Sequence, residues 1–269
     1  MSHSSVPNSP TPLFSIITVT WNAISTLPVT MQSVAAQTFR SYEHLIIDGR
    51  STDGTVEYAS SHLTANTLLR SEPDNGLYDA MNKGIKIAKG KYLIFLNAGD
   101  TFHSPDTLAK IAEAAGSLPT PDIIYGQTDI VDSHRHRIAD RHLIAPEHLT
   151  PHSFADGMVV CHQAFIARRD IAGEFDTSYR YSADYEWCIR CLLASHSNHY
   201  IPATLIDYLM EGVSTANRRA SLSERFTIMR RYYGLPLTVV RHLAFVPRFL
   251  ARRRLERKAI AKISKTDNK

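Results

Sequence analysis

Carboxylate and amide side chains recur in the first part of the chain, each time directly after a short apolar run. Asp48 follows the run HLII, and the segment FLNAGD ends a second run in Asn97 and Asp100. Carboxylate oxygens bind hard cations such as Mg²⁺ or Mn²⁺, which in turn bind the phosphate groups of a substrate. The pattern therefore predicts a site for a phosphorylated ligand accompanied by a divalent cation.

The apolar runs that carry these residues alternate with segments of helical spacing. Strands are predicted at 14–21, 42–49, 67–73 and 91–99, and helices at 26–37, 54–65 and 76–90. Strands separated by helices form a parallel sheet with both faces covered, and ligands bind outside the carboxyl ends of its strands. We expect one crevice lined by the residues at these ends: Thr20 and Asn22, Asp48 and Asp53, Glu72 and Asp74, and Asn97 and Asp100.

The pattern changes beyond Pro119. We expect two strands around a polar turn at 122–140, a strand leading into a helix at 158–171, a helix at 182–195 and a pair of strands at 199–210. The predicted organisation is a flexible lead (1–12), one α/β domain (13–215, with a nucleotide-sugar-binding half at 13–118 and an acceptor half at 119–215) and a basic amphipathic helical tail (216–269).

Composition and motifs exclude several classes of protein. The chain has 269 residues, of which 43% are hydrophobic, as in a globular protein, and its net charge of +4 is too small to indicate nucleic-acid binding. The turn TWNAIST after the first strand lacks the glycines of a dinucleotide-binding or Walker A loop. The first twelve residues do not form a signal peptide, and Cys188 and Cys191 are expected to be buried thiols, so we expect a cytoplasmic protein.

The segment FLNAGD has a specific chemical interpretation. Asp100 is predicted to hold Mg²⁺ or Mn²⁺ with a diphosphate, which the small residues Ala98 and Gly99 let approach closely. Asp48 is predicted to hydrogen-bond a uracil ring N–H or a ribose hydroxyl. A helix N-cap or a turn also explains a single aspartate after a strand, and STDG around Asp53 is a common turn composition.

Four segments of the chain together resemble the inverting family 2 glycosyltransferases with the GT-A fold, especially bacterial enzymes of surface-polysaccharide assembly. The segments are SIITVTWN, HLIIDGRSTDGT, SEPDNGLYDAMNKGI and FLNAGD. The resemblance runs from about Leu13 to Met210 and implies a Rossmann-like, mostly parallel mixed sheet flanked by helices. It places Thr20, Asn22, Asp48 and Asp53 around the nucleotide base, Asp74 and Asn82 along the sugar-nucleotide cleft, and Asp100 on the metal. Many relatives read L-D-x-D-D where this chain has Asn97 and Gly99, which leaves one carboxylate.

The segment HQAFIARRDIAGEFDTSYRYSADYEWCIR resembles the acceptor side of the same family. It implies that Asp184 is the general base that deprotonates the acceptor hydroxyl, whereas Glu186, two residues on, faces another way on a helix. His162 and Gln163 are candidates for the sugar pocket. Asp184 could also be an acid that the helix dipole favours in a first turn.

Three basic segments have open interpretations. Arg168 and Arg169 could meet phosphate or face water, and the run SHRHR (133–137) is most simply a solvated hairpin turn. The arginines and apolar residues of 219–258 could lie in a membrane interface, close to a lipid-linked acceptor, or pack back on the domain.

The leading functional hypothesis is an inverting enzyme that transfers one hexose or N-acetylhexosamine from a UDP-sugar to a lipid-linked or oligosaccharide acceptor in cell-surface polysaccharide biosynthesis. It would work at the cytoplasmic face of the inner membrane. The alternatives are a non-catalytic nucleotide-sugar-binding or membrane-scaffold protein on the same fold, and a sugar nucleotidyltransferase.

Overall fold

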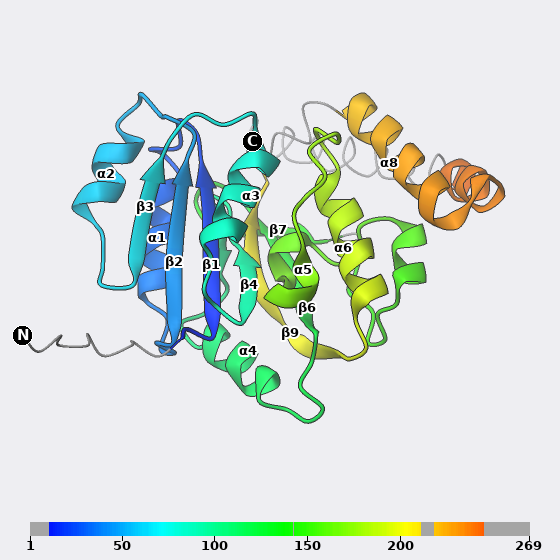
Figure 1. Cartoon of the computed structure of the whole chain (residues 1–269), viewed down its shortest axis with the longest axis horizontal. Coiled ribbons are helices and arrows are strands. Elements are labelled where there is room, and N and C mark those ends of the chain that lie inside the picture. Colours follow the sequence, from blue (N-terminus) through cyan, green and yellow to red (C-terminus); the bar gives the residue numbers. More distant parts are fainter. Residues whose placement is uncertain (1–10, 142, 211–217, 245–269) are drawn as a thin grey trace, which may run out of the picture. The chain divides into compact units, whose positions relative to one another are not determined.

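The computed structural model describes residues 11–141, 143–210 and 218–244 (Figure 1). The chain divides into two compact units, one ending at Ser221 and one beginning at Leu222. The predicted boundary between domain and tail at 215–216 lies outside the described residues, as do most of the predicted lead and the end of the predicted tail.

The N-terminal half contains the predicted parallel strands. They are β1 (Phe14–Thr20), β2 (Tyr42–Asp48), β3 (Thr67–Ser71) and β4 (Tyr92–Phe95). β1 pairs in parallel with both β2 and β4, and β2 pairs in parallel with β3. All seven residues of β1 are buried, as expected for a central strand whose two faces are both covered. The carboxyl ends of these strands therefore meet at one edge, as the sequence predicts.

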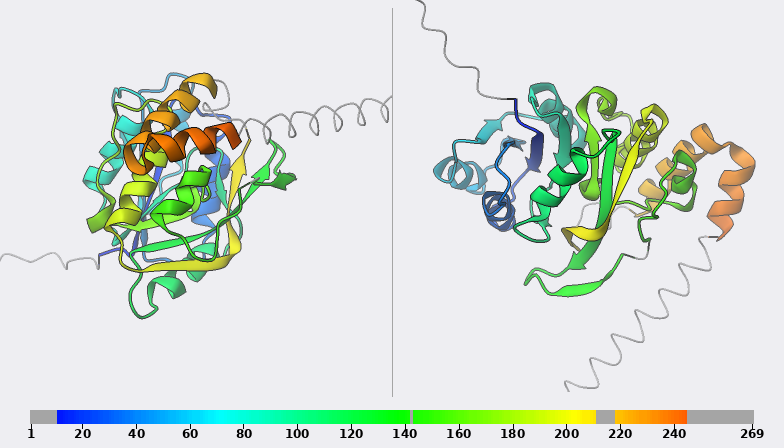
Figure 2. Two further views of the ribbon diagram at one scale, coloured as in Figure 1. Left: turned by 90° about the vertical axis from the view of Figure 1, so that its right-hand side faces the viewer. Right: turned by 90° about the horizontal axis from the view of Figure 1, so that it is seen from below.

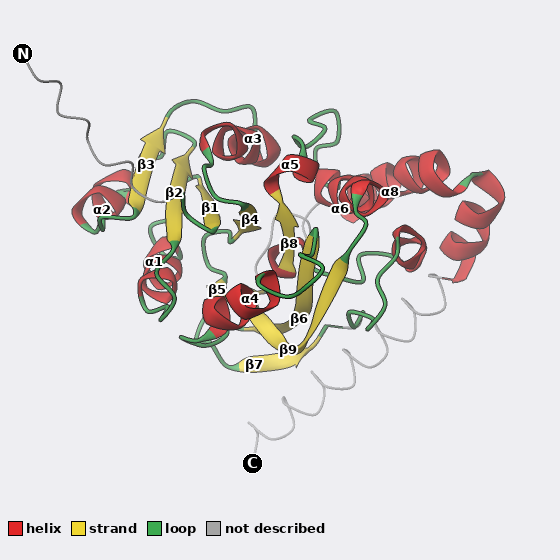
Figure 3. Cartoon of the chain, turned by 60° about the horizontal axis from the view of Figure 1, so that its bottom comes forward, coloured by secondary structure: helices red, strands yellow, loops and turns green. Residues whose placement is uncertain are grey.

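Helices cover both faces of this parallel half (Figure 3). They are α1 (Leu27–Ala35), α2 (Thr55–Ser61) and α3 (Leu77–Ile87). Leu27 of α1 packs with Ile46 of β2 in one cluster, whereas α3 lies on the other face. There a Cβ atom at Gly84 would come within 2.6 Å of Ile17. The glycine lets α3 approach the sheet closely.

The second half adds strands of both orientations to the same sheet. They are β5 (Thr101–Phe102), β6 (Ile123–Val131), β7 (Arg137–Asp140), β8 (Phe165–Arg168) and β9 (Asn198–Leu209). The strand order is β3-β2-β1-β4-β8-β6-β9-β5, with β7 paired to β6. Figure 2 shows β6 and β7 as a long green hairpin beside the yellow strand β9. The mixed sheet of the prediction is confirmed.

Short elements and further helices complete the domain. They are α4 (Thr107–Ala115), α5 (Arg169–Ala172), α6 (Ala183–Ala194), η1 (Pro151–Asp156) and η2 (His162–Ala164). The sequence analysis does not anticipate β5, α4 or the two 3₁₀ helices. Its strand pair at 199–210 is wrong, because this segment is the single strand β9, which pairs with β6 and β5 on its two sides.

An aromatic cluster fixes α6 against the sheet. The indole of Trp187 is fully buried, and its ring centroid lies 5.0 Å from that of Phe175, 5.5 Å from Phe95 and 5.7 Å from Phe165. Large aromatic side chains contribute much of the apolar area that stabilises a core. The first turn of α6 is thereby held at a defined position beside β4.

The described part of the second unit contains α8 (Arg218–Tyr233), which begins shortly before the boundary, and a helical segment that reaches residue 244. Four large apolar side chains of this segment are more than a third exposed, namely Leu235, Val239, Val240 and Leu243. Within the described ranges, the chain has no helix with the length and apolar character that a membrane span requires.

Candidate active site

The Asp48 carboxylate joins the ends of three parallel strands. It accepts hydrogen bonds from the hydroxyls of Thr20 (2.9 Å), Ser51 (2.5 Å) and Ser71 (2.7 Å), and from the Ser51 backbone N–H (2.9 Å). Burial alone would raise its pKa, but these hydrogen bonds outweigh burial and hold the pKa below its usual value. Asp48 is therefore ionised, and its hydrogen bonds hold the ends of these three strands together at the predicted base-binding edge.

Asn22 and Asp53 join the loops that follow β1 and β2. The Asn22 amide oxygen accepts from the Thr52 N–H at 2.9 Å, and Asn22 itself has a positive φ of 49°. Asp53 accepts from the N–H groups of Ile24 and Thr55, both at 3.1 Å. The Thr55 hydroxyl is the main cause of the lowered pKa of Asp53. Asp53 therefore holds together the turn that its sequence predicts, and its position beside a nucleotide base stays a prediction.

Asp74 closes the same edge from the loop after β3. One of its oxygens accepts from the Gly76 N–H at 2.8 Å. The other would lie only 2.4 Å from a Cβ atom at position 49, so this approach requires the glycine that is present there. The structure thus brings Asp74 next to the residue that follows Asp48.

Asn82 is hydrogen-bonded to the backbone of Phe175. It is buried, its amide nitrogen donates to the Phe175 carbonyl at 2.9 Å, and its amide oxygen accepts from the Phe175 N–H at 2.7 Å. Through these two hydrogen bonds Asn82 ties α3 to Phe175. Its predicted position along the sugar-nucleotide cleft stays a prediction.

The loop after β4 carries Asn97 and Gly99. The Asn97 amide nitrogen lies 3.4 Å from Nε2 of His162, and its buried amide oxygen has no hydrogen-bond partner among the described residues. Gly99 has a φ of +99°, and its N–H donates to the Thr30 hydroxyl at 2.8 Å. A Cβ atom at position 99 would lie 2.7 Å from Cδ2 of Leu209. The positive φ is the main reason for glycine at this position.

Asp100, the predicted metal ligand, is not an open carboxylate. It is 3% exposed, and its two oxygens accept from the Leu209 N–H at 3.0 Å and from the Gln163 amide at 2.8 Å. Burial raises its pKa to about 6. A metal ion needs an oxygen that it can reach, so the buried, hydrogen-bonded carboxylate of Asp100 does not fit that role as described. Gln163, a candidate for the sugar pocket, is the side chain that donates to Asp100.

The guanidinium of Arg135 contacts the same loop. Arg135 lies in the hairpin between β6 and β7, and its guanidinium donates to the Gly99 carbonyl at 2.7 Å and to the Thr101 hydroxyl. The prediction that SHRHR is a merely solvated turn is therefore wrong for Arg135. Sequence spacing gives no signal for this contact, because the partners are 36 and 34 residues away.

Asp184 lies in the first turn of α6, where three side chains from different elements meet. The Tyr78 hydroxyl of α3 donates to one oxygen of Asp184 at 3.0 Å, and Nδ1 of His162 lies 3.3 Å from the other. Glu186 is only 2% exposed and pairs with Arg190 at 3.3 Å. The carboxylate facing this meeting point is thus that of Asp184. Sequence reasoning missed Tyr78, although it stands in the YDAMNKG block.

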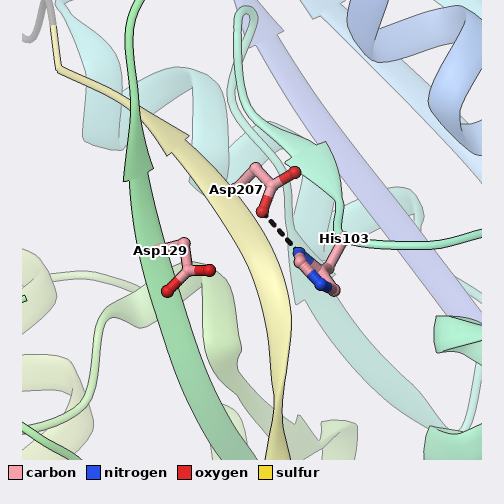
Figure 4. A group of neighbouring side chains, drawn as sticks. All are labelled: His103, Asp129 and Asp207. Atoms are coloured by element: carbon pink, nitrogen blue, oxygen red, sulfur yellow. Dashed lines mark hydrogen bonds and ion pairs between the residues drawn. The ribbon is translucent and has the colours of Figure 1, made fainter. Parts of the chain in front are cut away.

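One group of described residues has donor atoms suited to a metal ion. His103 follows β5, Asp129 lies on β6 and Asp207 lies on β9, and one ligand atom from each lies within 4.8 Å of the others (Figure 4). Nδ1 of His103 is 2.7 Å from Asp207, while Asp129 pairs with Arg137 at 3.0 Å. The sequence analysis did not select these residues, because the sheet brings them together from distant positions.

Arg168 and Arg169 lie elsewhere. Arg168 pairs with Asp122 and Asp170, each at 2.6 Å, and Arg169 donates to the Gly90 carbonyl at 2.9 Å. They line a depression of about 520 Å³ whose other lining residues are Lys91, Thr120 and Asp170. This depression contains none of the donor-side residues described above.

The fold and these strand-end residues define an α/β transferase of the GT-A type. The chain belongs to glycosyl transferase family 2, whose family model matches residues 15–175. It is 32% identical over 238 residues to the PGL/p-HBAD biosynthesis glycosyltransferase of Mycobacterium bovis (strain BCG / Pasteur 1173P2), covering 84% of this chain and 85% of that protein. The protein is therefore a glycosyltransferase, as the leading hypothesis holds.

Two further comparisons agree with this assignment. The amylovoran biosynthesis glycosyltransferase AmsB of Erwinia amylovora is 28% identical over 197 residues, which are 66% of this chain and 63% of that protein. The crystal structure of S. aureus TarS 1-349 in complex with UDP-GlcNAc superposes with a TM-score of 0.65 at 18% identity, covering 85% of this chain and 66% of that one. The second comparison confirms the predicted GT-A fold.

Proposed function

We propose that this glycosyltransferase transfers a single hexose or N-acetylhexosamine from a UDP-sugar to a lipid-linked or oligosaccharide acceptor, with inversion at the anomeric carbon. The observation that carries the proposal is the position of Asp184, beside Tyr78 and His162 and near the Asn97 end of β4. The complex of TarS with UDP-GlcNAc supports a uridine diphosphate donor on this fold.

The donor would lie along the strand ends. In this proposal the loops that carry Thr20, Asn22 and Asp53 enclose the base, and the Asp48 carboxylate keeps them in register. Asp74 narrows the same edge, and Gly99 keeps the β4 end free of a side chain. Among the described residues the buried amide oxygen of Asn97 has no partner, and it would accept from a sugar hydroxyl, since a buried polar atom without a partner is unfavourable until a ligand satisfies it.

Asp184 would act as the general base. It removes the proton of an acceptor hydroxyl while that oxygen forms a bond to the anomeric carbon, and the bond from this carbon to the diphosphate breaks on the opposite face. The Tyr78 and His162 contacts fix the carboxylate in the orientation that this step requires. In the tautomer with its proton on Nδ1, His162 would direct this N–H toward Asp184, 3.3 Å away, and would accept from the Asn97 amide through Nε2, which would couple the base to the donor side.

We further propose that the enzyme binds a divalent cation, Mn²⁺ or Mg²⁺. Among the described residues, the group of His103, Asp129 and Asp207 offers the ligands, because two carboxylates and one imidazole come within reach of one ion. Asp100 does not fit this role, for the reasons given above, and no step of the transfer is assigned to the cation.

The proposed acceptor class rests on the second unit and on the relatives. Leu235, Val239, Val240 and Leu243 expose apolar surface on a helical segment near several arginines, which suits the interface of an anionic membrane that holds a polyprenyl-linked acceptor. The name of AmsB connects a relative with the synthesis of a polysaccharide. Peripheral attachment at the cytoplasmic face of the inner membrane is part of the proposal.

The proposal can be tested by the stereochemistry of the product. The enzyme is incubated with α-linked UDP-hexoses and UDP-N-acetylhexosamines and with synthetic short polyprenyl diphosphate saccharides, and the new linkage is examined by ¹H NMR. We expect a β-linked product from one donor. A product with retained α-configuration would overturn the single-displacement mechanism and the assignment of Asp184 as base.

A further inference from the structure

The hairpin between β6 and β7 brings a guanidinium to the loop of residues 97–100, which we call the NAGD loop. Arg135 donates to the Gly99 carbonyl at 2.7 Å and to the Thr101 hydroxyl, so the cation lies on the loop that follows β4. A guanidinium has five N–H donors in a fixed plane, and these two contacts within the described residues use two of them. Donors therefore remain for an anion.

The backbone of Arg135 indicates that its side chain matters beyond the turn. Its φ of +67° lies in the left-handed region, where glycine or asparagine is usual and other residues are strained. The turn is already closed without the side chain, because the Arg135 N–H donates to the Asp132 carbonyl at 3.0 Å and the Asp132 carboxylate accepts from the His136 N–H at 2.8 Å. The guanidinium contacts with the loop are a reason for an arginine at this position.

The NAGD loop has little accessible negative charge of its own. Asn97 and Gly99 carry no charge, and the one carboxylate of the loop, Asp100, is buried and hydrogen-bonded to Gln163 and Leu209. The loop therefore lacks accessible negative charge with which to hold a metal ion, while Arg135 places a permanent positive charge against it. A diphosphate that approaches Gly99 would meet a guanidinium, which binds phosphate oxygens in a bidentate way.

We propose that Arg135 binds the diphosphate of the donor directly and stabilises the negative charge that this group gains as it leaves. This inference rests on the proposed UDP-sugar function.

The test compares the affinities of UDP and uridine, measured by calorimetry in EDTA with the full-length protein. The key variant is Arg135→Gly, because glycine suits the backbone at φ +67° and so removes the guanidinium without straining the hairpin. Arg135→Lys keeps one positive charge, and Arg137→Ala removes a neighbouring cation that pairs with Asp129 instead.

We expect Arg135→Gly to weaken UDP binding by about tenfold to a hundredfold while uridine binding stays unchanged, since only UDP carries the phosphates. Arg135→Lys should recover part of the loss, and Arg137→Ala should bind UDP like the wild type. Unchanged UDP binding by Arg135→Gly, or an equal loss for UDP and uridine, would overturn the proposal. Wild-type protein that binds UDP with MnCl₂ but not in EDTA would also overturn the proposal. Wild-type protein that binds neither compound under either condition would instead overturn the UDP-sugar function, a result distinguishable from a failure of Arg135 alone.

Discussion

The Tyr78 hydroxyl donates a hydrogen bond to the Asp184 carboxylate at 3.0 Å, across 106 residues of sequence. Tyr78 lies on α3 in the predicted nucleotide-sugar-binding half, whereas Asp184 lies on α6 in the predicted acceptor half. The bond therefore places the proposed base at the junction of the two halves, where a donor and an acceptor would meet.

Replacing the base should abolish transfer but leave donor binding intact. Asp184→Asn keeps the size of the side chain but cannot accept a proton, so we expect kcat to fall by about a hundredfold to ten-thousandfold. UDP affinity, measured by calorimetry, should not change. Asp170→Asn is a suitable control, because this aspartate is exposed and pairs with Arg168. Transfer by Asp184→Asn at the wild-type rate would exclude Asp184 as the base.

Tyr78→Phe should show how far the hydroxyl positions the base. The ring of Tyr78 packs against Phe175 with centroids 5.5 Å apart, and phenylalanine keeps this packing. We expect kcat to fall by about tenfold, the loss of one hydrogen bond to a charged group, with the donor KM unchanged. Steady-state kinetics with varied donor measures both. A raised KM at constant kcat would instead make Tyr78 a donor-binding residue.

Mn²⁺ should stabilise the protein through His103, Asp129 and Asp207. An ion that binds only the folded state raises the melting temperature as its concentration rises. We expect this shift in the wild type and in Asp100→Asn, and its loss in His103→Ala. A differential scanning fluorimetry titration with MnCl₂ and MgCl₂ measures it. Loss of the shift in Asp100→Asn but not in His103→Ala would show that the ion binds at the NAGD loop and not at His103.

Acid should destabilise the fold through His44. This side chain is 2% exposed, its Nε2 lies 2.9 Å from the Thr18 hydroxyl, and burial lowers its pKa to about 4. Between pH 6.5 and 4 the unfolded chain binds a proton at this histidine that the folded chain does not. Its contribution to the free energy of unfolding is thus fully present above pH 6.5 and is lost as the pH falls, by on the order of 3 kcal/mol.

Urea unfolding at pH 7.5, 6, 5 and 4.5 measures this effect. The free energy of unfolding of His44→Gln should fall less steeply over this range than that of the wild type. Parallel profiles for the two proteins would show that His44 is not the titrating group.

The sequence predicts the parallel half well, because β1, β2 and β4 are apolar runs whose polar residues stand where the strands end. Asp48, Asp53 and Asp74 accordingly come together as expected. The environment of Asp100 could not be predicted, since its partners Gln163 and Leu209 lie 63 and 109 residues away. The contact of Arg135 with Gly99 could not be predicted either, because it depends on where the hairpin lies and not on local spacing.

Release of UDP from a panel of UDP-sugars is the measurement that tests the central claim most directly. Wild-type protein and Asp184→Asn are compared with UDP-hexoses and UDP-N-acetylhexosamines, with synthetic polyprenyl diphosphate saccharides as acceptors and with Mn²⁺, Mg²⁺ or EDTA. A UDP-sugar glycosyltransferase should release UDP from one donor in the presence of acceptor, and Asp184→Asn should not. Absence of both UDP release and UDP binding in the wild type would contradict the account.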